Sequence, residues 1–378
     1  MCAKKNNTIK KQSQRILFLY LNTGNGHKTI ANSVKKGIEC YPHFLEKDKL
    51  FLKHGFNPKY RLLTMFYEGG YRFTIDYLPG AYSFFYDINC NKHVLNISKH
   101  FTVWGNVRYL KHIVKKHTIT KIVSFHFAVS PIAEKVIQRY FPHIQLINVI
   151  TDPYTAHPAW FLTKKAGYVF FSQQLADYYV PKCNIDNYTI QPFPIHPIFK
   201  KRIKQKNNTE QFKVLIAGGG EGFKKALNIA KCFAKKEAAI SLVIVCGRNK
   251  KLQKQLERII KQHPLFDLQV YGFVHNMHEL MFQSDCVISK CGASIVHEVL
   301  ASGKPYIISQ YIHGQEKGNM HFIKNNNCGW FIQDEKKIYQ KVIELKNNQE
   351  YYDTICKNIE KCTIDSDLTE ISKYIINF

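Results

Sequence analysis

Short runs of mostly apolar residues alternate along the chain with segments in which apolar residues recur at helical spacing. The runs hold four to six residues, which is enough for a buried strand and too few for a helix. They are Ile16–Leu21, Ile122–Phe127, Gln145–Ile150 and Tyr168–Phe171 in the first half, and Val214–Ala217, Leu242–Cys246, Leu268–Tyr271, Cys286–Ser289 and Tyr306–Ser309 in the second. Because strands that alternate with helices build parallel sheets, this pattern predicts an α/β protein.

The alternation forms two series, and each begins with a strand, a glycine-containing loop and a helix. In the first series Ile16–Leu21 leads into Asn22–His27 (NTGNGH). The pattern restarts at Val214–Ala217, which is followed by Gly218–Gly222 (GGGEG) and another helical pattern. The Lys- and Asn-rich stretch Lys200–Gln211 separates the two series and is typical of a linker. We therefore expect two Rossmann-like domains.

The first loop has the features of a phosphate site. Gly24 and Gly26 allow positive φ values and let the backbone approach a ligand closely. The helix that follows offers unpaired N–H groups and the positive end of its dipole, which favour an anion. His27 lies where such a ligand would bind. A tight turn with a surface histidine explains the same residues equally well, because a lone glycine-rich loop is a weak signal.

A second candidate site lies in Asp285–Glu298, which reads DCVISKCGASIVHE. A strand there leads through a short loop into a helix, and ligands of open α/β sheets bind at the carboxyl ends of strands. Glu298, on that helix, can accept hydrogen bonds from both hydroxyls of a ribose, while N–H groups of the loop can hold phosphate. Further along, in GQEKGN, Gln315, Glu316 and Asn319 can present polar groups to a sugar.

One segment departs from the alternation. Tyr60–Tyr86 (YRLLTMFYEGGYRFTIDYLPGAYSFFY) is dense in aromatic residues. Tyrosine suits a membrane interface because its ring has an apolar body and a polar tip. The surrounding Lys and Arg residues also favour contact with anionic lipid. The alternative interpretation is that these aromatic residues form part of the core of the first domain.

The charge balance points to anionic partners. The 378 residues carry a formal net charge of +26, while 45% of them are hydrophobic, so the chain can bury sizeable cores. Nucleic acid, anionic lipid and phosphorylated substrates all fit such a charge, and an AT-rich genome also enriches Lys, Asn and Ile. Neither zinc-finger spacing nor an RNP-type signature occurs, so we expect no nucleic-acid partner.

Compartment and membrane topology follow from three further features. No apolar run approaches the ~20 residues that a membrane-spanning helix needs. The basic N-terminal stretch 1–15 leads into a short apolar run without a small-residue cleavage site, so we interpret it as a flexible arm. The 11 cysteines are scattered without a CxxC pair, which is typical of reduced thiols in the cytoplasm.

Taken together, these motifs resemble those of the GT-B glycosyltransferases. The chain is similar to the group that includes monogalactosyldiacylglycerol synthase, the processive diacylglycerol glucosyltransferases and, more distantly, the lipid I N-acetylglucosaminyltransferase. The matching elements cover most of the chain in the same order: NTGNGH, TDPYTAHPAW at 151–160, AGGGEG at 217–222, YGF at 271–273, SKCGAS, Glu298 and GQEKGN. The aromatic segment resembles the acceptor region of the diacylglycerol branch.

The resemblance implies a GT-B fold, in which two Rossmann-like domains face each other across a cleft. Residues 1–200 would form the acceptor- and membrane-binding domain, and residues 201–355 the UDP-sugar-binding domain. A helical tail, residues 356–378, would return to the first domain. Such enzymes transfer a hexose with inversion and need neither a metal nor another cofactor, because helix termini and backbone amides offset the diphosphate charge.

The resemblance also assigns roles to the donor side of the cleft. Glu298 would bind the ribose. Gln315, Glu316 and Asn319 would contact the sugar, and the Gln-Glu pair favours glucose or galactose over N-acetylglucosamine. The remaining donor-side residues are Gly272 and Phe273 beside the uracil, Gly219, Gly220 and Gly222 beside the diphosphate, and Lys290, Gly292, Ala293 and Ser294 beside the nucleotide and sugar.

On the acceptor side, His27 matches the loop histidine of the family and is the expected catalytic base, since an imidazole titrates near neutral pH. Two alternatives stay open: His27 only orients the acceptor or contacts phosphate, and a carboxylate such as Asp76 or Glu68 acts as the base. The loop residues Gly24, Asn25 and Gly26 would contact acceptor or phosphate. We expect the cleft wall to include His126, Asp152 and His157, and no metal site.

The sequence therefore predicts a UDP-sugar-dependent hexosyltransferase that acts on diacylglycerol or a glycolipid. Its expected partners are a UDP-hexose, that lipid acceptor and an anionic membrane surface. Its expected location is the cytoplasm, at the inner face of the membrane. Two alternatives remain: transfer of N-acetylglucosamine to a polyprenyl-linked or other acceptor, and a basic membrane- or nucleic-acid-binding protein that kept a transferase fold.

Overall fold

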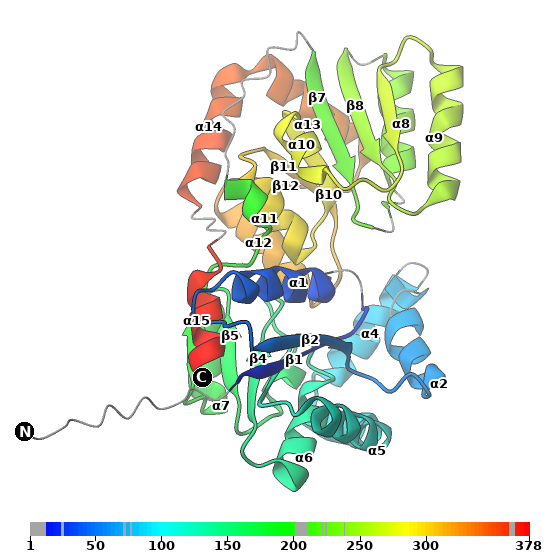
Figure 1. Cartoon of the computed structure of the whole chain (residues 1–378). Helices are drawn as coiled ribbons and strands as arrows, with labels where there is room; N and C mark the ends of the chain where they lie inside the picture. The colour runs from blue at the N-terminus through cyan, green and yellow to red at the C-terminus, as the bar shows by residue number, and fades with distance from the viewer. Residues whose placement is uncertain are drawn as a thin grey trace, which may run out of the picture.

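The structure is a computed structural model that describes residues 13–378 except 24, 25, 71, 72, 76, 77, 201–210, 221, 224, 238 and 363–366. Two six-stranded parallel sheets, each flanked by helices, form its two halves (Figure 1). The predicted α/β class is therefore confirmed. Four predicted features lie outside the described residues: Gly24 and Asn25 of the first loop, Asp76, and most of the basic arm and the linker.

The first sheet has the strand order β2-β1-β3-β4-β5-β6. Its strands are β1 Arg15–Tyr20, β2 Lys49–His54, β3 Lys121–Ser124, β4 Gln145–Val149, β5 Gly167–Phe170 and β6 Tyr188–Ile190. Its helices are α1 Gly26–Glu39, α2 Arg61–Thr64, the π-helix η1 Met65–Gly70, α4 Pro79–Asn89, α5 Lys92–His117, α6 Ser130–Tyr140, the 3₁₀ helix η2 Pro158–Phe161, α7 Gln173–Cys183 and the 3₁₀ helix η3 Pro197–Lys200.

The second sheet has the order β12-β11-β10-β7-β8-β9. Its strands are β7 Phe212–Ala217, β8 Ile240–Val245, β9 Leu268–Tyr271, β10 Cys286–Lys290, β11 Tyr306–Gln310 and β12 Gly329–Phe331. Its helices are α8 Ala226–Lys235, α9 Lys250–Gln262, α10 Met277–Phe282, α11 Ala293–Ala301, α12 Lys317–Asn325, α13 Glu335–Asn347 and α14 Gln349–Lys361, and the chain ends with α15 Thr369–Asn377.

Each apolar run predicted from the sequence is a strand, whereas β2, β6 and β12 were not predicted. All three lie at the edges of their sheets. β2 (KLFLKH) is charged and has no fully buried position, and β6 and β12 have three residues each. An edge strand exposes one side to solvent and is kept short or charged, so it lacks the apolar run that identifies a central strand.

The strand order places one crevice at the carboxyl edge of each sheet. In the first sheet the order reverses beside β1, so the loops after β1 and β3 diverge. In the second sheet the reversal lies between β7 and β10. Ligands of open α/β sheets bind at such points. The two crevices contain the NTGNGH loop and the Lys290–Ser294 loop that the sequence singled out.

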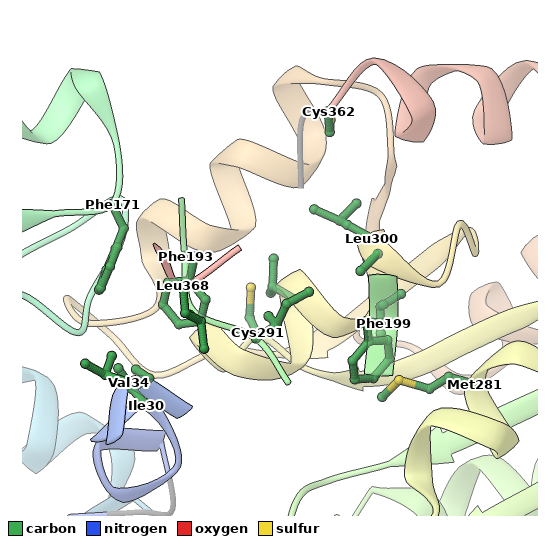
Figure 2. Close-up of a cluster of buried hydrophobic side chains, with 14 of the residues drawn as sticks. Ile30, Val34, Phe171, Phe193, Phe199, Met281, Cys291, Leu300, Cys362 and Leu368 are labelled. Atoms are coloured by element: carbon green, nitrogen blue, oxygen red, sulfur yellow. The ribbon is translucent and has the colours of Figure 1, made fainter. Parts of the chain in front are cut away.

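The two halves pack directly against each other. Ile30 and Val34 of α1 belong to the same buried cluster as Cys291 and Leu300 of the second half (Figure 2). Figure 1 shows α1 lying below α11 and α12. Because this apolar contact is continuous, it holds the carboxyl edges of the two sheets opposite each other.

The chain crosses back to the first half at its end. Helix α15 packs on α1, where Leu368 and Ser372 lie against Gly37 (Figure 1). The ammonium group of Lys121 donates hydrogen bonds to the carbonyls of Ile375 (2.6 Å) and Ile376 (3.0 Å) at the end of α15. Burial lowers the pKa of Lys121 to about 8. The helix thus ties the end of the chain to β3.

The aromatic segment lies at the edge of the first domain's core, where only Leu63 and Tyr67 of its described residues are packed against the buried cluster. None of its described residues is buried, and Leu62, Phe66, Phe84 and Phe85 expose 78%, 75%, 63% and 56% of their surface. The apolar surface continues along α5, where Trp104 is 85% exposed. Monomeric proteins rarely expose so many large apolar side chains on neighbouring elements. In the part of the chain that the structure describes, no helix has both the length and the apolar character of a membrane span.

Candidate functional site

The glycine loop after β7 is held by backbone contacts that only glycine permits. Gly219 and Gly222 both have φ values of +75°. A Cβ atom on Gly222 would lie 2.5 Å from the carbonyl oxygen of Cys246. The loop after β8 approaches equally closely, because the Arg248 amide donates to the Gly220 carbonyl over 2.8 Å. Gly219 itself has no heavy atom within 4 Å of its Cβ position, so a ligand can approach the backbone there.

The opposite side of this crevice holds polar atoms without partners. Gly292 precedes α11 and offers no side-chain cap to the N–H groups of the first turn. The buried hydroxyl of Ser294 has no hydrogen-bond partner among the described residues. Asn319 donates to the Cys291 carbonyl (2.9 Å), but its own side-chain oxygen accepts no bond from the described part of the chain. Buried polar groups are normally paired, so these atoms are available for hydrogen bonds to a ligand in this crevice.

Glu298 lies in the second turn of α11. Its partly buried carboxylate makes no hydrogen bond to any residue that the structure describes. Burial raises the pKa of this carboxyl group to about 7. An unpaired carboxylate is unfavourable in such surroundings unless a ligand with hydroxyl donors satisfies it.

The loop after β9 borders the same crevice at the edge of the sheet. Phe273 is 48% exposed, and the guanidinium carbon of Arg248 lies 5.2 Å from the centroid of its ring. Gly272 lies near the side chain of Gln253 in α9, because a Cβ atom on Gly272 would be 3.4 Å from Gln253 Oε1. An exposed aromatic ring and accessible backbone amides can contact a flat heterocycle.

The loop before α12 connects the two sides of the cleft. Glu316 accepts a hydrogen bond from the Ile312 amide (2.9 Å), and its other oxygen lies 3.6 Å from a Cβ position on Gly292. Burial raises the pKa of Glu316, and the positive charge of Lys290 and the Ile312 amide oppose that effect. The side-chain amide of Gln315 reaches across and donates to Asp152 Oδ1 over 3.0 Å.

Asp152 follows β4 and is 6% exposed. Besides the Gln315 amide, its carboxylate accepts a hydrogen bond from the indole of the buried Trp160 (3.2 Å). Burial raises the pKa of Asp152 to about 6; these two hydrogen bonds lower it and the charge of Glu316 raises it. Sequence reasoning placed Asp152 in the cleft wall but gave no reason to expect its contact with the second half.

His27 is enclosed by its neighbours. It is 4% exposed, its Nδ1 lies 2.7 Å from the Thr151 hydroxyl, and its ring also hydrogen-bonds to the backbone of Phe125. Burial lowers the pKa of His27 to about 4, and the Phe125 hydrogen bond opposes this. His27 also contacts the ring of His126, with 4.8 Å between centroids. Gly26, just before it, has no heavy atom within 4 Å of its Cβ position.

The two other cleft-wall histidines also have assigned contacts. His126 Nδ1 accepts from the Ala128 amide (3.1 Å), so its Nε2 carries the proton and donates to Thr23 Oγ1 (2.9 Å). His157 Nδ1 accepts from the Ala159 amide (3.1 Å) and caps η2. Burial lowers the pKa of both histidines, that of His157 to about 4. These contacts keep both rings neutral and fixed.

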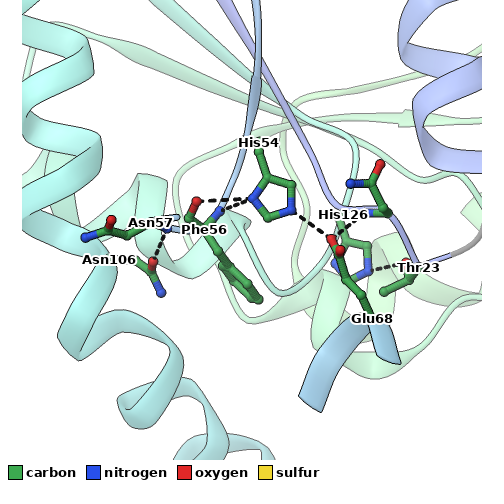
Figure 3. Close-up of polar contacts among 8 residues, drawn as sticks. Thr23, His54, Phe56, Asn57, Glu68, Asn106 and His126 are labelled. Carbon is green, nitrogen blue, oxygen red and sulfur yellow. Dashed lines mark hydrogen bonds and ion pairs between the residues drawn. The ribbon is translucent and has the colours of Figure 1, made fainter. Parts of the chain in front are cut away.

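A polar cluster that the sequence did not predict holds the start of the first loop (Figure 3). Glu68 Oε1 accepts hydrogen bonds from the Asn22 amide and from His54 Nε2, each over 2.7 Å. Burial lowers the pKa of His54, but the Glu68 carboxylate and the Phe56 carbonyl outweigh it, so the net pKa is raised. The sequence pattern did not indicate this contact, because His54 in β2 and Glu68 in η1 are fourteen residues apart.

Helix α4 places an aromatic side chain at the mouth of the cleft. The ring of Tyr86 contacts His157, with 4.9 Å between centroids, and covers Gly314, which has a φ value of +73°. One residue later, Asp87 Oδ1 lies 3.1 Å from His313 Nε2 in the second half. The acceptor-side aromatic segment and the loop that carries Gln315 are therefore in direct contact.

Within the described residues, no group of three or more His, Cys, Asp or Glu side chains is arranged to hold a metal ion. The expectation of a metal-independent reaction stays a prediction. The same holds for the roles assigned to the site residues, although the described members gather at the facing edges of the two sheets. Asp76, one of the two carboxylates considered as a base, lies outside the described residues.

Comparisons with known proteins identify the second half directly. Residues 213–363 match the glycosyltransferase family 28 C-terminal domain. The chain is 26% identical over 366 residues to monogalactosyldiacylglycerol synthase 1 of Arabidopsis thaliana, a match that covers 86% of this chain and 63% of that protein. It is 27% identical over 383 residues to synthase 3 of the same plant, covering 95% of this chain and 80% of that one. The chain therefore spans less than two thirds of the length of the first of these relatives.

Solved structures establish the fold of the whole chain. MurG of Acinetobacter baumannii superimposes with a TM-score of 0.62 at 14% identity, covering 97% of this chain and 100% of MurG. MnaA of S. aureus, solved with UDP, superimposes with a TM-score of 0.61 at 10% identity, covering 96% and 97%. The resemblance drawn from the sequence is thus confirmed: the chain has the GT-B fold, is similar to the monogalactosyldiacylglycerol synthases, and carries a glycosyltransferase family 28 C-terminal domain.

Proposed function

We propose that this protein is an inverting glycosyltransferase that moves a hexose from a UDP-sugar to diacylglycerol or a glycolipid at a membrane surface. The observation that carries the proposal is the group of unpaired polar atoms in the second crevice, on Glu298, Ser294 and Asn319. The first domain carries an exposed apolar surface on α2, η1, α4 and α5, and Tyr86 of α4 contacts the second half at Gly314. A polar donor site joined through α4 to an apolar acceptor surface suits transfer of a sugar to a lipid.

The donor would bind along the carboxyl edge of the second sheet. Glu298 would accept hydrogen bonds from the ribose hydroxyls, and the uracil would lie against Gly272 and Phe273. The diphosphate would lie between the Gly219–Gly222 loop and the first turn of α11, where N–H groups and the helix dipole favour negative charge. This arrangement offsets the diphosphate charge without a metal, so we expect the reaction to proceed in EDTA.

The sugar would lie beside the loop that precedes α12. Gln315 and Glu316 are placed between the first turn of α11 and Asp152, which is where the anomeric carbon must lie if the diphosphate sits at α11. The Gln-Glu pair favours a hexose with a free 2-hydroxyl group, glucose or galactose. The relatives named as monogalactosyldiacylglycerol synthases support the same choice of sugar class and a diacylglycerol acceptor.

The acceptor would reach the cleft from a lipid surface. The exposed apolar residues of α2, η1, α4 and α5 lie among exposed basic residues, including Lys59, Arg61 and Arg108. Apolar side chains that insert into a membrane and cations that contact anionic lipid contribute independently to binding. Helix α4 belongs both to this surface and to the cleft, so it would guide the acceptor hydroxyl toward the donor sugar.

The experiment that tests the proposal offers the protein a panel of radiolabelled UDP-sugars with liposomes that contain diacylglycerol, a glycolipid or a polyprenyl phosphate-linked acceptor. We expect labelled glycolipid from UDP-glucose or UDP-galactose with diacylglycerol or the glycolipid. Glu298→Gln serves as the control that loses donor binding. Label on the polyprenyl acceptor from UDP-N-acetylglucosamine, or no labelled lipid from any pair, would overturn the proposal.

A further inference from the structure

We propose that Asp152 is the catalytic base, the group that takes the proton from the acceptor hydroxyl. This inference rests on the proposed function, because it names the proton acceptor for that transfer. It replaces His27, which the sequence favoured for the role, with a carboxylate that the sequence placed only in the cleft wall.

The surroundings of His27 argue for a scaffold role. A base must have a ring nitrogen free to contact the substrate proton. In His27, Nδ1 is engaged by the Thr151 hydroxyl, and the ring also hydrogen-bonds to the Phe125 backbone. Thr151 directly precedes Asp152, so His27 holds the turn that carries Asp152.

Asp152 lies where the donor and acceptor sides meet. Its Oδ1 is 3.0 Å from the amide of Gln315, in the loop proposed to contact the sugar. Glu316, the next residue, lies beside Gly292 at the start of α11, where the diphosphate would bind. On the other side, Tyr82 and Tyr86 of α4 are close enough for the Asp152 charge to raise their pKa values. An acceptor that enters along α4 therefore meets Asp152 before it meets the sugar.

The Asp152 carboxylate still has lone pairs that can accept the proton of an acceptor hydroxyl. Each of its oxygens accepts one hydrogen bond, from Gln315 or from Trp160, and a carboxylate has about four lone-pair sites. The Trp160 indole fixes the orientation of the carboxylate from within the first domain. When a donor sugar engages Gln315, Oδ1 gains a free direction toward the cleft.

Glu68 has a different position and a different role. Its Oε1 is shared by the Asn22 amide and His54, at the start of the first loop. Its contacts are with the first loop and with β2, and the structure records none with the described residues of the second half. Glu68 is therefore a positioning residue that fixes the loop ahead of α1.

The transfer step balances with Asp152 as the base. The acceptor oxygen bonds to the anomeric carbon while its proton passes to a carboxylate oxygen of Asp152. The bond between the anomeric carbon and the diphosphate oxygen breaks, and its electron pair leaves with UDP. Asp152 returns the proton to solvent when the products leave. Attack from the Asp152 side, opposite α11, inverts the anomeric configuration.

The charged and titratable neighbours of Asp152 set its pH dependence. Glu316 faces it from the second domain, Tyr82 and Tyr86 face it from α4, and His157 packs on Tyr86 from its own loop. The tyrosines stay neutral in the working range because their pKa values are raised. Since burial raises the pKa of Asp152 to about 6, the base-competent form is lost as the pH falls through 6.

The test compares Asp152→Asn and Asp152→Ala with the wild type, using the donor and acceptor pair that the panel identifies. We expect Asp152→Asn to lower kcat at least ~100-fold, the lower range for loss of a general base, with UDP affinity within ~3-fold of wild type. The wild-type kcat should fall about tenfold per pH unit well below pH 6. The residual activity of Asp152→Asn should not show this decrease at acidic pH. Formate should partly restore turnover to Asp152→Ala but not to Glu68→Ala.

Asp177→Asn, on the exposed side of α7, is the matched control and should leave turnover unchanged. Thermal unfolding and UDP binding of each variant separate misfolding from loss of chemistry. Turnover within threefold of wild type in folded Asp152→Asn, or formate rescue absent from folded Asp152→Ala, would overturn the role of Asp152 and leave the proposed function standing. Absence of lipid glycosylation by the wild type would overturn both.

Discussion

At the scale of residues, burial shifts the pKa values of the histidines and of the carboxyl groups in the cleft in opposite directions. The cleft-wall histidines His27, His126 and His157 are buried, and each has a ring nitrogen in a hydrogen bond, so they are neutral parts of the scaffold. The carboxyl groups of Asp152 and Glu298 are buried with pKa values raised toward neutrality. Groups perturbed in this way concentrate at functional sites, which supports roles for both carboxylates in ligand binding or chemistry.

Glu298 gives a prediction that combines affinity and pH. Glu298→Ala should weaken UDP binding by ~1.5–3 kcal/mol, the range for hydrogen bonds to a charged group. Because the pKa of Glu298 is about 7, the ionised acceptor form is lost as the pH falls, so wild-type affinity for UDP should be lower at pH 6 than at pH 8. Calorimetry on the wild type, Glu298→Ala and Glu298→Gln checks both effects.

The control for this prediction is Glu279→Gln, an exposed carboxylate on α10. Glu279→Gln should bind UDP as the wild type does. If folded Glu298→Gln kept both the wild-type affinity and its pH dependence, Glu298 would not contact the nucleotide.

At the scale of elements, the sequence predicted the central strands and the loops that follow them, because buried strands need apolar runs and crevices form where such strands end. It did not predict β2, β6 or β12, since edge strands bury less. It also did not predict the Glu68–His54 or Asp152–Gln315 contacts. Each of these two contacts joins elements that become neighbours only in the folded protein. The spacing of residues along the chain therefore does not predict such pairs.

Helix α4 gives a prediction of its own. Phe84 and Phe85 are largely exposed, while Tyr86 faces the cleft. Changing both phenylalanines to serine should weaken binding to liposomes that contain anionic lipid, because apolar insertion is lost while the basic residues remain. Cosedimentation measures the effect, and binding of both proteins should fall as salt rises, since salt screens attraction beyond ~8–10 Å.

Leu265→Ser is the matched control, because Leu265 is a fully exposed apolar residue in the second domain. It should bind liposomes as the wild type does. Equal loss of binding in Leu265→Ser and in the double phenylalanine variant would show that the surface on α4 has no specific role at the membrane.

At the scale of the whole molecule, the facing edges of the two sheets are held together by one apolar cluster and by α15, which crosses back to α1. The net charge of +26 adds a long-range attraction for anionic surfaces. The fold also brings the aromatic segment into contact with the second half, because Tyr86 of α4 packs on Gly314. Motif order predicted the two Rossmann-like domains of the fold, whereas the contacts between them required the structure.

The buried histidines predict how the stability of the molecule depends on pH. Folding lowers the pKa values of His27, His157 and His297 to about 4, below the unfolded value near 6.5. The unfolded chain therefore binds more protons between pH 6.5 and 4, so these histidines make stability fall as the pH drops through that window. The raised pKa values of Asp152 and Glu298 act in the opposite direction over part of it.

His126 acts with these three histidines, and Glu316 with the two carboxyl groups. Because four histidines oppose three carboxyl groups, we expect a net loss of stability between pH 6.5 and 4.5. Denaturant unfolding at a series of pH values measures it. Replacing His297 with glutamine should reduce the slope of stability against pH, since one of the four neutral rings is then absent. A free energy of unfolding that is constant or rises as the pH falls through this window would contradict the buried, neutral assignment of these rings.

The account predicts a direct transfer of hexose from UDP to a lipid hydroxyl, with the acceptor attacking from the side of Asp152. The measurement that tests this most directly is ¹H NMR of the reaction of a UDP-α-hexose with diacylglycerol liposomes, followed as the product forms. A β-linked hexosyl lipid as the first product, together with one equivalent of UDP, is the expected result. An α-linked lipid, or UDP released with free or epimerised sugar and no glycolipid, would contradict it.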